Sequence, residues 1–73
     1  MIELTKRREE RGLTKQKLSF KSQVAATTIG QIEAGRFVPY EPQLKRLAIA
    51  LEYNGDPTDL LRPVVGDEGG LAG

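Results

Sequence analysis

Apolar residues recur at helical spacing along this chain of 73 residues, and they predict a series of short helices. The clearest amphipathic segment has Pro42 in its first turn and is predicted to end at Asn54 and Gly55. Its apolar positions follow the i, i+3, i+4, i+7 rule and are Leu44, Leu47, Ala48 and Leu51. Asp56 is predicted to cap a final short helix that has Pro57 at its first position.

The stretch 14–35 predicts two further helices joined by a tight turn. Thr14 is the expected N-cap of the first helix, the turn is expected at 22–25, and the second helix is expected at 26–34. The positions predicted to face inward are Leu18, Ser22, Val24, Ile29 and Ile32. Both helices are shorter than the roughly 12–15 residues that an isolated helix needs in water, so both must pack on flanking segments. Two short helices with a small, polar outer face on the second are typical of a helix-turn-helix that reads DNA.

The segment 3–11 is strongly helix-forming and is followed by Gly12, which suits a left-handed helix end. Leu4 and Arg8 lie one turn apart on the same face, so a cation occupies a position where the apolar stripe should continue. A buried Arg needs a partner, and Glu33 is the predicted one. The alternative is that the Arg8 stem is buried and its charged end reaches solvent.

The composition excludes several kinds of chemistry. The chain contains no cysteine and no histidine, which excludes a structural zinc site and a His-assisted nucleophile. It also lacks a phosphate-binding loop of the G-x-x-x-x-G-K type. No apolar run approaches the roughly 20 residues of a membrane span, and the N-terminus is charged from its third residue. We therefore expect one small cytoplasmic domain that is not an enzyme and has no metal, cofactor or membrane contact.

The charges are distributed unevenly. Residues 1–36 carry eight Lys and Arg against four Glu, whereas residues 37–73 carry three bases against six acids. A basic half that contains the predicted helix-turn-helix is the pattern expected of a phosphate-binding face. Lys15, beside the free N–H groups of its helix start, is a candidate phosphate contact. Ordinary scatter of solvated charges is the alternative.

The chain resembles the phage Cro/repressor family of helix-turn-helix regulators, also called the xenobiotic-response-element type, from Leu4 to about Leu61. The residues that match at family spacing are Leu4, Arg8, Gly12, Leu13, Thr14, Leu18, Val24, Ile29, Ile32, Glu33, Gly35, Pro39, Leu44, Leu47, Ala48, Ala50, Leu51 and Leu60. This resemblance implies an all-α, five-helix, lambda-repressor-like DNA-binding domain over residues 1–62. Residues 63–73, which are rich in Gly and acidic, are predicted to be a disordered tail.

The resemblance also implies roles for individual residues. Arg8 and Glu33 correspond to the structural ion pair of the family. The positions that correspond to base-edge contacts are Ala26, Thr27, Gly30 and Gln31, and those that correspond to phosphate contacts are Lys15, Arg36 and Tyr40. The chain is accordingly expected to be a sequence-specific regulator of transcription on double-stranded DNA, a repressor of phage, prophage or bacterial kind that works as a homodimer. The apolar residues left over for dimer contacts are Tyr53, Leu60, Leu61, Val64 and Val65.

The chain departs from the family pattern at Ser19, at Gln23 in the turn and at Ala25, where a side-chain cap is expected. A non-Gly residue in a left-handed turn and a missing side-chain cap each cost on the order of 1 kcal/mol. Phe20 and Phe37 lie where the family is usually polar. These two rings are either scattered surface apolar residues or a partner-binding patch. The alternative function is an antitoxin or other protein-interaction module that binds and inhibits a partner protein through these rings and the tail, and the small side chains of Ala26, Thr27 and Gly30 are the sequence feature in its favour.

Overall fold

The computed structural model describes residues 1–64, and this part of the chain is helical. Its elements are α1 (Glu3–Glu10), α2 (Lys15–Ser22), α3 (Ala26–Glu33), α4 (Glu41–Ala50) and the 3-10 helix η1 (Pro57–Leu61). The prediction of an all-α fold is confirmed. The prediction of five α-helices is not, because the last element is a five-residue 3-10 helix. No helix among residues 1–64 has the length and apolar character needed to cross a lipid bilayer.

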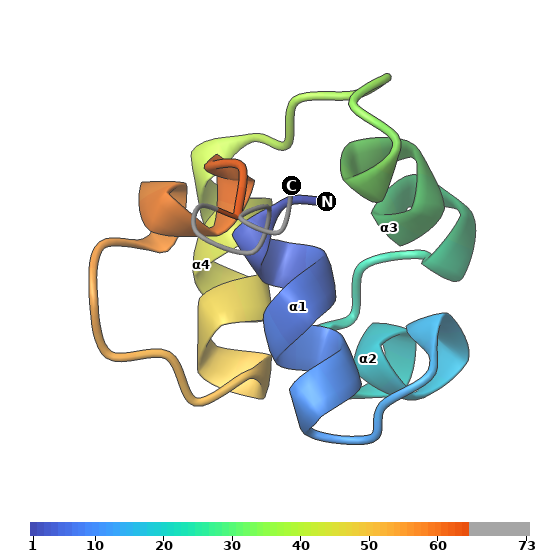
Figure 1. The fold of residues 1–73 in the computed structure, drawn as a ribbon. Coiled ribbons are helices and arrows are strands. Elements are labelled where there is room, and N and C mark those ends of the chain that lie inside the picture. The colour runs from blue at the N-terminus through green and yellow to red at the C-terminus, as the bar shows by residue number, and fades with distance from the viewer. Residues whose placement is uncertain (65–73) are drawn as a thin grey trace, which may run out of the picture.

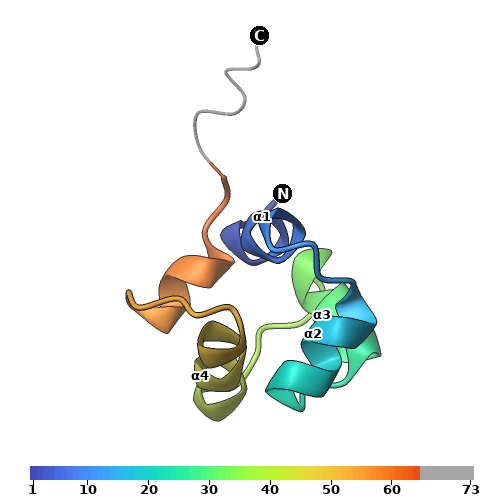
Figure 2. The same cartoon turned by 90° about the horizontal axis from the view of Figure 1, so that it is seen from below.

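The helices surround one core. Figure 1 shows α1 in front, with α4 on its left and α2 and α3 on its right. Seen from below in Figure 2, α1, α2, α4 and η1 surround a common interior. The residues that fill it are Leu4, Leu18, Val24, Ile29, Ile32, Leu44, Leu47, Ala48, Leu51 and Leu60. All five positions of 14–35 that were predicted to face inward are buried, so that interpretation is confirmed.

The predicted helix caps are present. The Thr14 hydroxyl accepts a hydrogen bond of 3.1 Å from the Lys17 N–H, and an Asp56 carboxylate oxygen accepts one of 3.0 Å from the Thr58 N–H. These bonds satisfy donors that have no partner inside the helix. The bonds from Thr58 lower the pKa of Asp56. Gly12 follows α1 with a φ of 67°, as the sequence predicted.

Helix α4 ends earlier than the sequence predicted. It stops at Ala50 rather than at Asn54 and Gly55, because Glu52 adopts a left-handed conformation with a φ of 57°. The Tyr53 N–H then donates to the Ala48 carbonyl at 2.8 Å, which satisfies one of the last carbonyls of the helix. Gly55 has a different role from the predicted one. A Cβ at this position would lie 2.6 Å from the Tyr53 hydroxyl oxygen, so any other residue would require the ring to shift.

The Tyr53 ring joins α1 to the C-terminal part of the domain. The Arg7 guanidinium lies over the ring at 4.4 Å from its centroid, and the Tyr53 hydroxyl donates a 2.8 Å hydrogen bond to Asp59. Leu60 is fully buried, and Tyr53 and Leu61 pack against the core of their own chain. The prediction that Leu60 contributes to a dimer interface is therefore wrong, because its side chain is already used inside the fold.

The two ends of the described chain lie side by side. The Glu3 N–H donates to the Arg62 carbonyl at 2.8 Å, and the Val64 N–H donates to the Met1 carbonyl at 2.9 Å. Between these bonds, Ile2 and Pro63 form an antiparallel bridge. Positions 63 and 64, which the sequence assigned to a disordered tail, are thus paired with the N-terminus. The remainder of the predicted tail, including Val65, lies outside the described residues.

High pH is expected to destabilise the fold through Tyr53. The hydrogen bond to Asp59 is the main cause that raises the pKa of Tyr53 above its usual value of about 10, with smaller contributions from burial and from the charge of Asp59, whereas Arg7 acts against them. Because the folded pKa lies above the unfolded one, the neutral hydroxyl stabilises the fold fully below pH about 10, and this contribution is lost as the pH rises through the folded pKa. Urea unfolding should therefore show a steeper loss of stability above pH about 10 for the parent than for Tyr53→Phe, which keeps the ring. Identical pH dependence of the two proteins would contradict this role.

Candidate nucleic-acid interface

Helix α3 presents a small and polar outer surface. Ile29 and Ile32 anchor its inner side in the core, while Thr27 and Gln31 are exposed. Ala26 and Gly30 are half-buried. Residues three and four apart lie next to each other on a helix, so these four residues, which were predicted to contact bases, form one continuous surface. We call this surface of Ala26, Thr27, Gly30 and Gln31 the α3 face.

The turn before α3 is held by a serine whose part in the turn the sequence did not reveal. The Ser22 hydroxyl donates to the Leu18 carbonyl at 2.7 Å and accepts from the Val24 N–H at 3.2 Å. Gln23 adopts the left-handed conformation with a φ of 61°, as its place in the family pattern implied, and Ala25 provides no side-chain cap for α3. The signal in the sequence was a polar residue at an inward-facing position, which needs a hydrogen-bond partner when it is buried.

Arg8 joins α1 to the end of α3. Its Nε donates to Glu33 Oε2 at 2.7 Å and its Nη2 donates to Glu33 Oε1 at 3.1 Å, while Nη1 donates to the Leu13 carbonyl at 2.8 Å. Only 10% of the Arg8 side chain and 8% of the Glu33 side chain are exposed. The hydrogen bond to Glu33 raises the pKa of the Arg8 guanidinium, although burial acts in the opposite direction. This two-bond pair fixes the orientation of α3 relative to α1.

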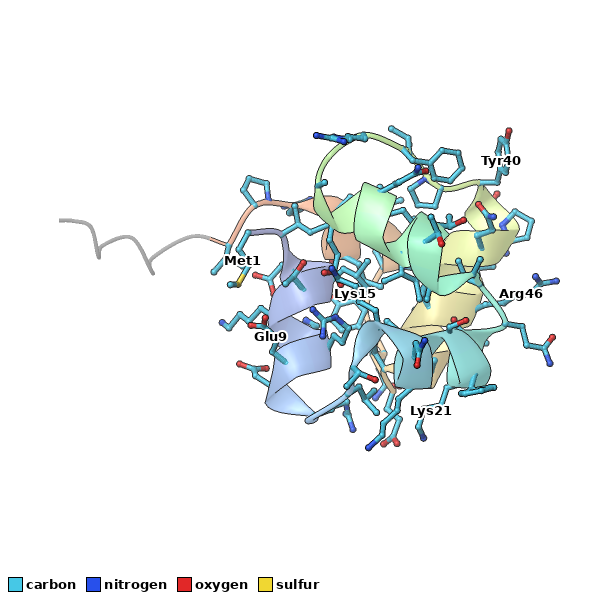
Figure 3. The ribbon with its side chains drawn as sticks, turned by 90° about the vertical axis from the view of Figure 1, so that its right-hand side faces the viewer. Met1, Glu9, Lys15, Lys21, Tyr40 and Arg46 are labelled. Atoms are coloured by element: carbon cyan, nitrogen blue, oxygen red, sulfur yellow. The ribbon has the colours of Figure 1, made fainter. Side chains whose placement is uncertain are left out.

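The three residues predicted to contact phosphates are exposed and come from three different places in the fold. Figure 3 shows Lys15 between α2 and α3, and Tyr40 beyond α3 at the start of α4. The Tyr40 side chain is 69% exposed, and its backbone N–H donates to the Gln43 side chain at 3.0 Å. Arg36 follows the end of α3, and its backbone N–H donates to the Gln31 carbonyl at 2.8 Å. Residues of this kind on both sides of α3 can contact the two walls of a DNA groove.

The two phenylalanines differ in their surroundings. Phe20 is 85% exposed on the outer side of α2. Phe37 is half-buried, packs against the core and meets the Tyr40 ring edge-on, with 6.0 Å between the ring centroids. Part of the Phe37 ring is therefore covered by its own chain, so Phe20 offers the larger apolar surface to a partner.

The described residues contain no group of three or more His, Cys, Asp or Glu side chains suited to a metal ion.

The fold and the α3 face define a helix-turn-helix protein, in which α2 and α3 are joined by the turn that the Ser22 hydroxyl holds. Comparison with protein families agrees, because the family described as helix-turn-helix matches residues 4–57. The chain belongs to this DNA-binding family, of the Cro/C1 type found in transcription regulators. Comparisons with curated proteins and with solved structures gave no significant match.

Proposed function

We propose that this protein is a sequence-specific repressor that inserts α3 into the major groove of DNA. The observation that carries the proposal is the α3 face, which exposes Thr27 and Gln31 and sits on a helix held at both ends. Within residues 1–64, neither of these two side chains forms a hydrogen bond to another residue. The amide of Gln31 can pair with N6 and N7 of adenine, and the methyl group of Thr27 suits that of thymine. Ala26, which is half-buried, offers a second methyl group at the edge of the groove.

Most of the binding energy in this proposal comes from phosphates. Arg36 and Tyr40 contact the backbone on one side of α3, and the start of α2 contacts it on the other side. Two copies bind an inverted repeat whose half-sites lie about one helical turn apart, because the two-fold symmetry of the protein matches that of the DNA. The place of action is the cytoplasm of a bacterium, where the DNA of the host or of a phage is accessible.

Selection of binding sites from a random duplex pool at ~0.1 M salt tests the proposal, because non-specific attraction is already weakened under these conditions. The expected result is an enriched inverted repeat with half-sites about 10 base pairs apart. A pool that remains random after several rounds would contradict sequence-specific binding. Reporter expression from a promoter that carries the selected site then distinguishes repression from activation.

Replacing Gln31 by Ala is expected to weaken binding to the best site by about 1–3 kcal/mol and to relax the preference at one or two base pairs. Gln16→Ala is the matched control, since Gln16 is also an exposed glutamine but lies on α2. The measurement is the dissociation constant on the selected site and on sites changed one base pair at a time. A loss that is equal on all sequences would show that Gln31 does not read a base.

A second candidate function is binding and inhibition of a partner protein, as an antitoxin does. The observation in its favour is Phe20, which exposes most of its ring on the outer side of α2. Copurification of one defined protein with the parent, and loss of that protein with Phe20→Ser, would support this function. Specific DNA binding that is unchanged in Phe20→Ser would show that the two activities use different surfaces.

A further inference from the structure

The Lys15 side chain lies against α3, beside Gly30 of the α3 face. A Cβ built on Gly30 would lie 3.9 Å from both Cδ and Nζ of Lys15. The Lys15 side chain therefore occupies the space next to α3 into which a side chain at position 30 would extend. Figure 3 shows the same arrangement, with Lys15 between α2 and α3.

Glycine at position 30 is not required by packing within the described residues. The contacts of 3.9 Å are ordinary van der Waals distances, and the backbone of Gly30 has no left-handed conformation. Glycine in the interior of a helix is unfavourable compared with alanine. What the missing side chain does provide is room beside α3 for the Lys15 side chain, which a long side chain at position 30 would occupy.

The charge of Lys15 is available for a ligand. No salt bridge involves Lys15 within residues 1–64. Glu33, the acid nearest to Gly30 along α3, already uses both carboxylate oxygens to bind Arg8. The three N–H donors of Lys15 thus remain for a group outside the protein.

We propose that Lys15 is a base-reading residue that donates to O6 and N7 of a guanine in each half-site. This inference rests on the proposed function and names a part of its target. A Lys that projected away from α3 would meet a phosphate, which carries no sequence information. An ammonium that lies beside Gly30 instead enters the groove together with the α3 face. Guanine presents two acceptors in the major groove, and Lys is one of the residues that read them.

The test is to repeat the site selection with Lys15→Ala and to compare its consensus with that of the parent. We expect one guanine per half-site to lose its preference, and the affinity for the parent site to fall about tenfold. Affinity for a site in which that guanine is already replaced should not change. Replacing the guanine by 7-deazaguanine, which lacks the N7 acceptor, should weaken the parent and leave Lys15→Ala unaffected.

Lys17→Ala is the matched control, because Lys17 is exposed on the same helix but does not lie at Gly30. It is expected to keep the guanine preference. Gly30→Ala should also keep this preference, because the added Cβ only reaches contact distance from Lys15. Gly30→Leu should displace the Lys15 side chain and therefore lose the preference for the same guanine. Circular dichroism of each variant shows that the fold is retained.

The outcomes separate the inference from the proposed function. If the parent selects a site and Lys15→Ala selects the same site with a uniform loss of affinity, Lys15 contacts a phosphate and the inference is wrong. If the parent selects no site, the proposed function fails and the inference fails with it. A loss of the guanine preference in Lys17→Ala as well would also overturn the inference, because the effect would then not depend on the position beside Gly30.

Discussion

Replacing Arg8 by alanine is expected to lower the free energy of unfolding by about 3 kcal/mol or more, the largest effect of any substitution considered for this protein. The change leaves the Glu33 carboxylate, which is 8% exposed, without its two hydrogen bonds. It also leaves the Leu13 carbonyl without the donor Nη1. A buried charge without a partner is more costly than the absence of the whole pair.

The melting midpoint measures this effect. For a domain of this size, 3 kcal/mol corresponds to a decrease of roughly 12 °C or more. Arg11→Ala is the matched control, because Arg11 forms an exposed ion pair with Glu52 that should contribute less than about 1 kcal/mol. The double variant Arg8→Met, Glu33→Leu should recover much of the loss, since it removes both charges together. A melting midpoint of Arg8→Ala within a degree of the parent would show that the pair does not stabilise the fold.

Replacing Ser22 by alanine is expected to cost about 1–3 kcal/mol of stability and also to weaken binding to the selected DNA site. The Ser22 hydroxyl is the acceptor for the Val24 N–H, and both residues are buried, so the N–H would lose its partner without gaining water. The turn also sets the direction in which α3 leaves α2. A small error in this direction moves the α3 face relative to the bases and loses hydrogen bonds that depend on geometry.

Ser19→Ala is the control for Ser22→Ala. Ser19 lies on the same helix, but its hydroxyl takes no part in the turn, and alanine is the better helix former. Chemical unfolding and DNA affinity should be measured for both variants at a temperature where each is fully folded. Ser22→Ala with unchanged stability would mean that water replaces the hydroxyl, and lower stability with unchanged affinity would mean that the turn does not control the reading geometry.

Local features of the sequence were sufficient to predict much of the candidate site. A cation at an apolar position of the first helix indicated a buried Arg8, and the structure pairs it with Glu33. The inward positions of α2 and α3 followed from helical spacing, because burial of one helix face repeats with the period of the helix. The caps Thr14 and Asp56 could be predicted because a cap acts within three residues of itself.

Apart from the Arg8–Glu33 pair, the features that depend on contacts between distant segments were not predicted. The Tyr53 ring is held by Arg7 of α1 and Asp59 of η1, just beyond the left-handed Glu52 at the end of α4. Leu60 was both a residue of the family pattern and a candidate dimer contact, and only the packing of the core shows that it is fully buried. The same packing shows that Phe37 is half-buried. The position of the Lys15 side chain beside Gly30 was not predicted for the same reason, because it depends on how α2 packs against α3.

The sequence by itself determined the helix-turn-helix and its family, because these depend on helical periodicity and on residues at fixed spacing. It also indicated the Arg8–Glu33 pair, which the structure then showed to be buried. The tertiary structure alone decided which apolar residues remain exposed, where α4 ends, how Ser22 holds the turn and which side chain lies beside Gly30. The physical reason is that burial and long side-chain contacts depend on the relative positions of α1, α2, α3, α4 and η1. Those positions result from packing the whole core at once.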